Sequence, residues 1–138
     1  MLVLVDTGVW SLALRRKVEH LSAHEQGLIS ALRELIEAGR AQLMGAVRQE
    51  LLSGIREEAS FRKLRDQLRA FEHAPLDVAD YEEAAQLNNQ CRARGIAGSA
   101  IDLLICAAAI RRNWQVFTTD RDFVRYATVL PLKLYHTP

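Results

Sequence analysis

The sequence predicts an α/β domain with three layers, α/β/α, around a central and mainly parallel sheet of about four to five short strands. Short apolar runs alternate along the chain with segments whose apolar residues recur at helical spacing. The runs are largely apolar, which is typical of strands buried on both faces of a parallel sheet. The 138 residues contain no linker, repeat or break in composition, so we expect one domain over residues 1–138.

The strands are expected at short apolar runs that polar or turn-forming residues interrupt. The first run opens the chain and stops at Asp6. The last apolar run lies close to the C-terminal end, so the predicted sheet contains strands from both ends of the sequence. The predicted strands are residues 1–5, 42–44, 73–76, 115–118 and 132–135.

Helices are expected between these strands. A short helix begins at residues 9–12, and residues 15–17 form a loop or a helix end. Ser22 and Glu25 form a capping-box pattern at the start of the next helix, and Gly39 fits its C-terminal stop. The other predicted helices cover residues 47–58, 61–72, 77–94, 99–112 and 119–126.

Five acidic residues stand out by their positions. Asp6 follows the first strand directly, and Asp120 and Asp122 follow a later one. Glu50 and Asp102 interrupt apolar stretches near the starts of helices. Ligands of open parallel sheets bind at the carboxyl ends of the strands, so these acids are expected to face one common edge.

Each acid also has a local structural explanation. Asp6 fits the N-cap of the helix that follows it, and Glu50 fits the solvated face of an amphipathic helix. Asp102 and Asp122 each follow a Ser or Thr by three residues, which is a variant of the capping box. The clustered interpretation is favoured because all five acids fall at strand ends or first helical turns.

Carboxylates that share a cleft repel one another unless a cation lies between them, and the pKa of at least one should then be raised. Mg²⁺ and Mn²⁺ prefer oxygen ligands and keep several waters. Hydrolysis of a phosphodiester is the reaction that such a site serves best. The four histidines and two cysteines show no metal-ligand spacing, and Cys91 and Cys106 are expected to be buried free thiols.

The basic residues are compatible with a polyanionic substrate. Fifteen of the eighteen are arginine, although the net charge is only +1. Arginine is better suited than lysine to bidentate contacts with phosphate. Ordinary solvated helix faces explain any single arginine equally well.

Four segments together resemble the PIN-domain family, and most closely its VapC-type ribonuclease toxins. No single segment is specific, but their order and spacing extend over nearly the whole chain. The segments are residues 6–10, 49–54, 102–109 and 118–123, with the sequences DTGVW, QELLSG, DLLICAAA and TTDRDF.

The resemblance implies a PIN fold and an endoribonuclease that depends on Mg²⁺ or Mn²⁺. It also implies a homodimer and inhibition by a cognate VapB-type antitoxin. Thr7 or Thr119 would hydrogen-bond a carboxylate or a water of the metal, whereas Gly8 replaces the Ser or Asn common in the family. The family's metal-centre positions correspond to Asp6, Glu50, Asp102 and Asp120, with Asp122 as a possible further contributor.

Other acid-rich α/β classes fit less well. A haloacid-dehalogenase-like phosphatase needs a second Asp at the position of Gly8, and a response-regulator receiver needs an acidic pair near Asp6. No glycine-rich nucleotide loop or GxSxG motif is present. The alternative from a different class is a non-catalytic PIN-like binding module, in which the acids are caps and surface charges.

The sequence also suggests partners and a compartment. The helical stripe of Leu28, Leu32 and Leu35 and the stripe in residues 47–55 offer apolar surface for a dimer, while Trp10 is expected in the core. No apolar stretch is long enough to cross a membrane, and no signal peptide is evident. A cytoplasmic protein is therefore expected.

Overall fold

Five short parallel strands form the sheet in the computed structural model, which describes residues 1–15, 17–71 and 73–137. Their order is β3-β2-β1-β4-β5, and every pairing is parallel. The predicted α/β class with a mainly parallel sheet is thus confirmed. The strands are β1 (Val3–Val5), β2 (Ala41–Met44), β3 (His73–Ala74), β4 (Gln115–Phe117) and β5 (Lys133–Leu134).

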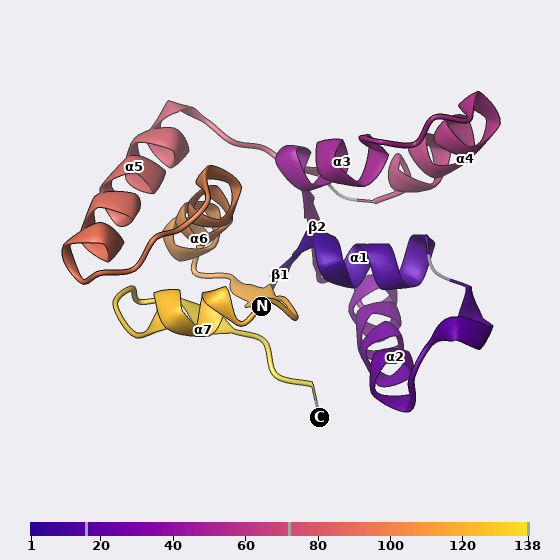
Figure 1. Cartoon of the computed structure of the whole chain (residues 1–138), viewed down its shortest axis with the longest axis horizontal. Coiled ribbons are helices and arrows are strands. Elements are labelled where there is room, and N and C mark those ends of the chain that lie inside the picture. The colour runs from indigo at the N-terminus through magenta and orange to yellow at the C-terminus, as the bar shows by residue number, and fades with distance from the viewer. Residues whose placement is uncertain (16, 72, 138) are drawn as a thin grey trace.

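Helices cover both faces of this sheet, with α1 and α2 on one side and α5 and α6 on the other (Figure 1). Helix α2 packs against β2, and α6 packs against β1 and β4. The helices are α1 (Thr7–Leu14), α2 (Ala23–Glu37), α3 (Gly45–Leu52), α4 (Glu58–Leu68), α5 (Val78–Ala93), α6 (Ala100–Arg112) and α7 (Asp122–Ala127), with a short 3₁₀ helix at Val18–His20.

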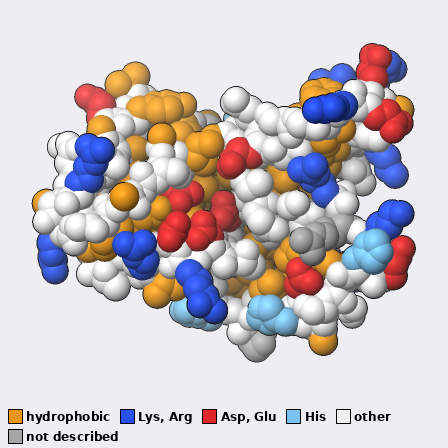
Figure 2. Space-filling view, viewed as in Figure 1, with side chains coloured by type: hydrophobic (Ala, Val, Ile, Leu, Met, Phe, Trp, Pro, Cys, Tyr) orange, Lys and Arg blue, Asp and Glu red, His pale blue; other side chains and the backbone are white. Residues whose placement is uncertain are grey.

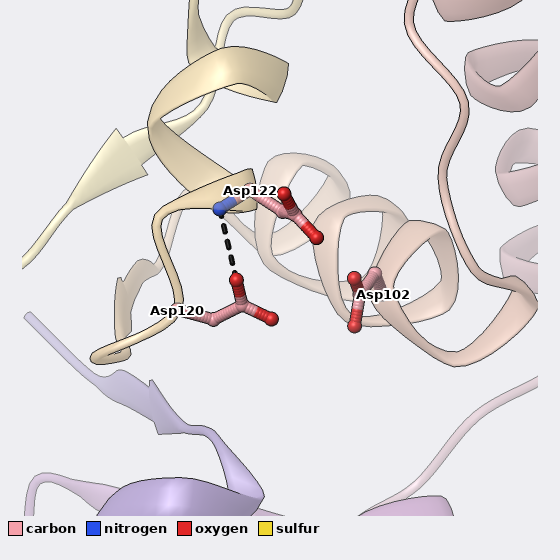
Figure 3. A group of neighbouring side chains, drawn as sticks. All are labelled: Asp102, Asp120 and Asp122. Atoms are coloured by element: carbon pink, nitrogen blue, oxygen red, sulfur yellow. Dashed lines mark hydrogen bonds between the residues drawn. The ribbon is translucent and has the colours of Figure 1, made fainter.

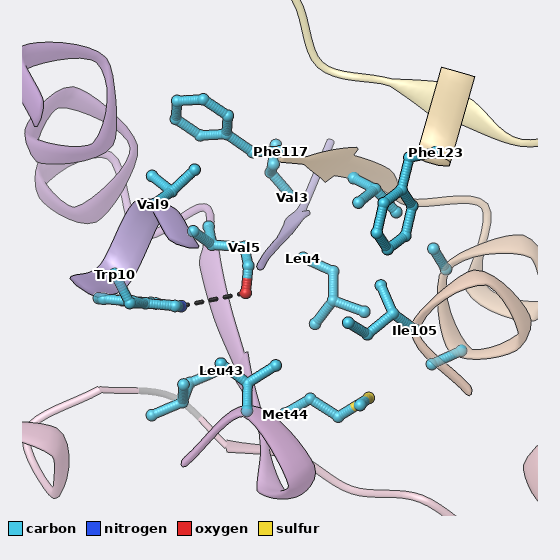
Figure 4. Packing of buried hydrophobic residues seen from close by; sticks show 14 of the residues in the cluster. Val3, Leu4, Val5, Val9, Trp10, Leu43, Met44, Ile105, Phe117 and Phe123 are labelled. Atoms are coloured by element: carbon cyan, nitrogen blue, oxygen red, sulfur yellow. Dashed lines mark hydrogen bonds between the residues drawn. The ribbon is translucent and has the colours of Figure 1, made fainter. Parts of the chain in front are cut away.

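The core is built around β1, whose three residues have no exposed surface. Trp10 of α1 packs beside this strand, and its indole Nε1 donates a hydrogen bond to the Val5 carbonyl oxygen at 3.1 Å (Figure 4). Its ring packs on Phe71 with 4.8 Å between centroids. The expected place of Trp10 in the core is confirmed. Its hydrogen bond to Val5 holds α1 against the end of β1.

The boundaries around α3 and α4 differ from the prediction. The helix expected over residues 47–58 ends at Leu52, and α4 begins at Glu58 rather than at residue 61. The backbone turns at Gly54, where φ is +87°, a value that glycine adopts without strain. The expected end of the next helix at Glu72 lies outside the described residues, as does the middle of the predicted loop at residues 15–17.

Two further helices also start elsewhere than predicted. Helix α1 begins at Thr7, directly after the strand, rather than near Val9. The helix expected from residue 119 begins only at Asp122, because the Asp120 side chain accepts a hydrogen bond from the Asp122 backbone N–H at 2.9 Å. Residues 118–120 therefore form a loop at the carboxyl edge of the sheet.

The apolar stripes proposed as a dimer surface are mostly core instead. Leu28, Leu32 and Leu35 of α2 are buried against the rest of the chain, and so are Val47 and Leu51 of α3. Their helical spacing reflects packing on the sheet, which produces the same pattern as a dimer interface. The two cysteines are buried free thiols, as expected.

A buried ion-pair network joins the start of α5 to the end of α6. Asp80 has no exposed surface, and its carboxylate accepts hydrogen bonds from Arg111 at 2.7 Å and from Arg112 at 2.6 and 2.8 Å. Asp77 caps α5 and is also contacted by Arg111. The guanidinium of Arg112 holds the pKa of Asp80 well below its usual range. The network fixes the helix that carries Asp102.

Asp80→Asn should lower the free energy of unfolding by about 2 kcal/mol at neutral pH, because charge-assisted hydrogen bonds are lost. A depressed pKa adds stability above the unfolded value of about 3.9. The difference between wild type and variant should therefore shrink as pH falls below that value towards the folded pKa. Urea denaturation at several pH values measures this. Asp66→Asn, on the exposed face of α4, should change stability little, and an equal effect of both substitutions would contradict the role of the network.

Candidate functional site

Asp6 lies at the carboxyl end of β1, between the central strands. Its backbone N–H donates to the Phe117 carbonyl oxygen at 2.9 Å, which ties it to the end of β4. Its carboxylate caps α1 by accepting from the Thr7 N–H at 2.8 Å. The second carboxylate oxygen accepts from the Thr118 hydroxyl at 2.8 Å. Asp6 is thus the helix cap that its sequence position suggested, and it is also held towards the loop that carries Asp120.

Asp102 lies in the first turn of α6, opposite that loop. Its backbone N–H donates to Ser99 Oγ at 3.0 Å, which is half of the capping box that the sequence suggested. Its side chain turns instead to Tyr126 of α7, whose hydroxyl donates to Oδ2 at 2.7 Å. Gly98 permits this approach, since a Cβ at that position would overlap Leu103 and crowd the Tyr126 ring.

The loop after β4 brings two more aspartates to Asp102. The Asp120 backbone N–H donates to Thr118 Oγ1 at 3.0 Å, so this hydroxyl links Asp120 to Asp6. One carboxylate oxygen from each of Asp102, Asp120 and Asp122 lies within 4.8 Å of the other two. Figure 3 shows the carboxylates of Asp120, in the loop, and of Asp122, at the start of α7, on the side that faces Asp102. Asp122, which the family resemblance implied only as a further contributor, lies in this group.

Glu50 stands apart from these three aspartates. Its Oε1 accepts a hydrogen bond from the Thr7 hydroxyl at 2.8 Å, and Thr7 is the neighbour of Asp6. Thr7 thus hydrogen-bonds a carboxylate, as the family resemblance suggested for one of two threonines. Among the described residues, the Thr119 hydroxyl makes no such bond to a carboxylate, and it lies 3.1 Å from where a Cβ on Gly8 would stand. Glycine at position 8 therefore leaves room for Thr119.

Burial raises the pKa of both Asp6 and Asp102. For each carboxyl, loss of solvent is the largest cause, and hydrogen bonds from neighbouring groups act against it. Repulsion from the Asp120 carboxylate raises both pKa values further. The expected rise in carboxyl pKa is present, but its main cause is burial rather than the repulsion between carboxylates that the sequence predicts.

The donor set fits a hard divalent cation. Asp102, Asp120 and Asp122 offer carboxylate oxygens close to one another, and Mg²⁺ and Mn²⁺ prefer such ligands. Two of the acids carry raised pKa values that a bound cation would lower again. The nearby Cys106 thiol is fully buried and burial raises its pKa, so it is a poor nucleophile.

The family assignment follows from a comparison with protein-family models. Residues 3–129 match the model of the PIN domain. The chain belongs to the PIN domain family. The expected family is therefore confirmed. No curated protein matches the chain significantly.

Solved structures share the fold of this PIN domain at low sequence identity. The crystal structure of FitAcB from Neisseria gonorrhoeae has a TM-score of 0.74 at 19% identity, over 99% of this chain and 98% of that one. VapBC2 from Rickettsia felis, bound to a DNA fragment from its promoter, has a TM-score of 0.77 at 17% identity and 98% coverage of both chains. VapBC-1 from nontypeable Haemophilus influenzae gives 0.70 at 15% identity, over 98% and 97%.

Two residues of this PIN domain's site escaped the sequence analysis. Thr118 was read as the end of a strand, and Tyr126 as part of a short helix. Thr118 had a usable signal, because a hydroxyl residue directly after a strand lies at the ligand-binding edge. Tyr126 had no such signal in the sequence, because its contact with Asp102 joins two separate helices. Among the described helices of the domain, none is long and apolar enough to cross a membrane.

Proposed function

We propose that this PIN domain, extending over residues 1–138, is the ribonuclease toxin of a type II toxin–antitoxin pair. It would act in the cytoplasm and hydrolyse phosphodiester bonds of RNA with Mg²⁺ or Mn²⁺. The observation that carries the proposal is the convergence of Asp102, Asp120 and Asp122 within 4.8 Å, next to a partly buried Asp6, at the carboxyl edge of a PIN-domain sheet.

Asp6 and Asp102 are the residues we assign as direct ligands. Both are partly buried and fixed by hydrogen bonds from Thr118 and Tyr126, so their carboxylates keep one orientation. Asp120, with Asp122 as a further contributor, completes the oxygen donors on the exposed side. A divalent cation bound there supplies positive charge to the phosphate and lowers the pKa of a water.

Glu50 and Thr7 have a supporting role in this proposal. Thr7 donates to Glu50 and lies next to Asp6, so the pair extends the acidic edge towards α3. From this position, Glu50 would orient a water or serve as an additional ligand. Thr119 lies next to Asp120, and its side chain makes no hydrogen bond among the described residues, so it would hydrogen-bond a water or the substrate.

The proposed partners are an antitoxin of the VapB type and a second copy of the chain. The names VapBC and FitAB of the similar structures support the antitoxin in this proposal. An antitoxin arginine would pair with the acids and compete with the cation. The homodimer is tested by the solution mass of the purified protein, and a strictly monomeric chain would contradict it without affecting the nuclease.

RNA cleavage by the purified protein tests the proposal. Labelled RNA should be cut in Mg²⁺ or Mn²⁺ and stay intact in chelator, because the acids alone provide no positive charge for the phosphate. Adding Mg²⁺ back should restore cleavage. A protein that binds no metal and cuts no RNA would instead be the non-catalytic binding module.

A further inference from the structure

A small recess opens beside the acidic cluster, between the loop after β4 and the segment that follows β5. Its volume is about 150 Å³, and it shares Asp120 with the cluster. Because Asp120 borders both, a ligand held at the acids has the recess directly beside it. The residues that matter most for its chemistry are Thr119, Asp120, Arg121, Val124, Tyr135 and His136.

The apolar wall of the recess is held in place. The Tyr135 backbone N–H donates to the Val116 carbonyl oxygen at 2.8 Å, which anchors it to β4. Its ring packs against the buried Phe117 with 5.1 Å between centroids. Val124 of α7 lines the same recess although 58% of its surface is exposed. An exposed valine beside an anchored aromatic ring provides a preformed apolar surface for a flat group.

The polar wall of the recess carries basic side chains. Arg121 and His136 are exposed, and within the described part of the chain neither side chain makes an ion pair or a hydrogen bond. Arg125 differs, because it lies 3.8 Å from Asp122. Figure 2 shows the red acids in the middle of this face with blue and pale-blue side chains directly below them. The positively charged Arg121 thus borders the acidic cluster.

We propose that this recess binds the nucleotide of single-stranded RNA that neighbours the scissile phosphate. The base packs on Tyr135 and Val124, and the phosphate of that nucleotide pairs with Arg121. This inference rests on the proposed ribonuclease function and adds a substrate contact to it. Base stacking on aromatic side chains and arginine contacts to phosphate are the usual means of holding single-stranded RNA.

The charges favour RNA over a peptide of the antitoxin in this recess. An antitoxin segment that pairs with the acids must be basic, and the Arg121 guanidinium would repel it. A nucleotide carries the opposite charge and a flat base, which suits a space of about 150 Å³ between an aromatic ring and an arginine. In this arrangement the acids bind the cation, and Arg121 binds the neighbouring phosphate.

Equilibrium binding of a short fluorescein-labelled RNA tests the inference by anisotropy, in EDTA so that the probe is not cut. Arg121→Gln should weaken binding and lower the slope of log Kd against log salt by about 0.7, the value for one phosphate contact on a single strand. Arg33→Gln, an exposed arginine on α2, is the matched control and should leave the slope unchanged.

Substitutions in the apolar wall test whether the base packs there. Tyr135→Leu should weaken binding at least about fivefold through lost stacking, whereas Tyr135→Phe should bind like wild type. Val124→Asp changes an exposed position, so the fold is retained, and it should weaken binding by placing an acid in the recess. Ser30→Asp adds the same charge on α2 and is its control.

Wild-type affinity and salt slope in both Arg121→Gln and Val124→Asp would overturn the inference. Unchanged RNA binding combined with lost antitoxin binding would identify a peptide site and would overturn it as well. Cleavage by the wild-type protein in Mg²⁺, measured in parallel, separates the two proposals. Cleavage with normal RNA binding by the variants refutes only the recess, whereas no cleavage by wild type refutes the proposed function and this assignment with it.

Discussion

Asp102→Asn is expected to lower metal-dependent RNA cleavage by more than about 100-fold, the upper range for residues that only support metal ligands. Asparagine keeps the shape of the side chain and an oxygen that accepts from Tyr126, so α6 and α7 should pack as before. What is lost is the charge that holds the cation. Initial rates on labelled RNA in saturating Mg²⁺ measure the effect, and circular dichroism checks the fold.

Asp66→Asn is the matched control for this experiment, since Asp66 lies on the exposed surface of α4. It should cut RNA at the wild-type rate. Asp6→Asn should resemble Asp102→Asn, because both acids are assigned as direct ligands. If both site variants cleave as fast as the control, the acids are structural residues and the assignment is wrong.

Mg²⁺ should raise the melting temperature of the wild-type protein by roughly 8–13 °C at a hundred times its Kd. Binding to the folded state alone contributes about 2.7 kcal/mol at that concentration, and each kcal/mol corresponds to roughly 3–5 °C for a chain of this size. Thermal melts at neutral pH with chelator and with Mg²⁺ measure the difference.

Asp6→Asn should behave unlike an ordinary core substitution in these melts. The raised pKa of Asp6 means that, without metal, stability falls as pH rises from the unfolded value of about 3.9 through the folded one. The variant removes this cost, so its apo form should be at least as stable as wild type, and its response to Mg²⁺ should shrink. A wild type indifferent to Mg²⁺ together with a strongly destabilised Asp6→Asn would make Asp6 a structural cap only.

The sequence predicted the sheet and the edge where the acids lie because both depend on local pattern. Apolar runs mark the strands, and an acid directly after a run lies at its carboxyl end, as for Asp6. The order of the strands and the grouping of Asp122 with Asp102 depend on how distant segments pack. Periodicity could not separate the core face of α2 from a dimer surface, because both bury the same apolar stripe.

The main cause of the raised pKa values was also beyond the sequence. Repulsion among acids could be inferred from their number, whereas burial of Asp6 and Asp102 depends on packing around the site. The hydroxyls of Thr118 and Tyr126, which fix these two carboxylates, come from a loop and a helix without any motif of their own. The residue types therefore indicated the chemistry of the site, whereas the burial and the orientation of its carboxylates depend on the fold.

The central claim is that the acids at the carboxyl edge of the sheet hold a divalent cation. Anomalous diffraction from crystals grown with Mn²⁺ tests it most directly, since the peak locates the ion without an assay of activity. We predict a peak in contact with Asp6 and Asp102, with Asp120 beside it, and no such peak in crystals of Asp102→Asn. Wild-type crystals in which Mn²⁺ binds only elsewhere on the surface would contradict the account.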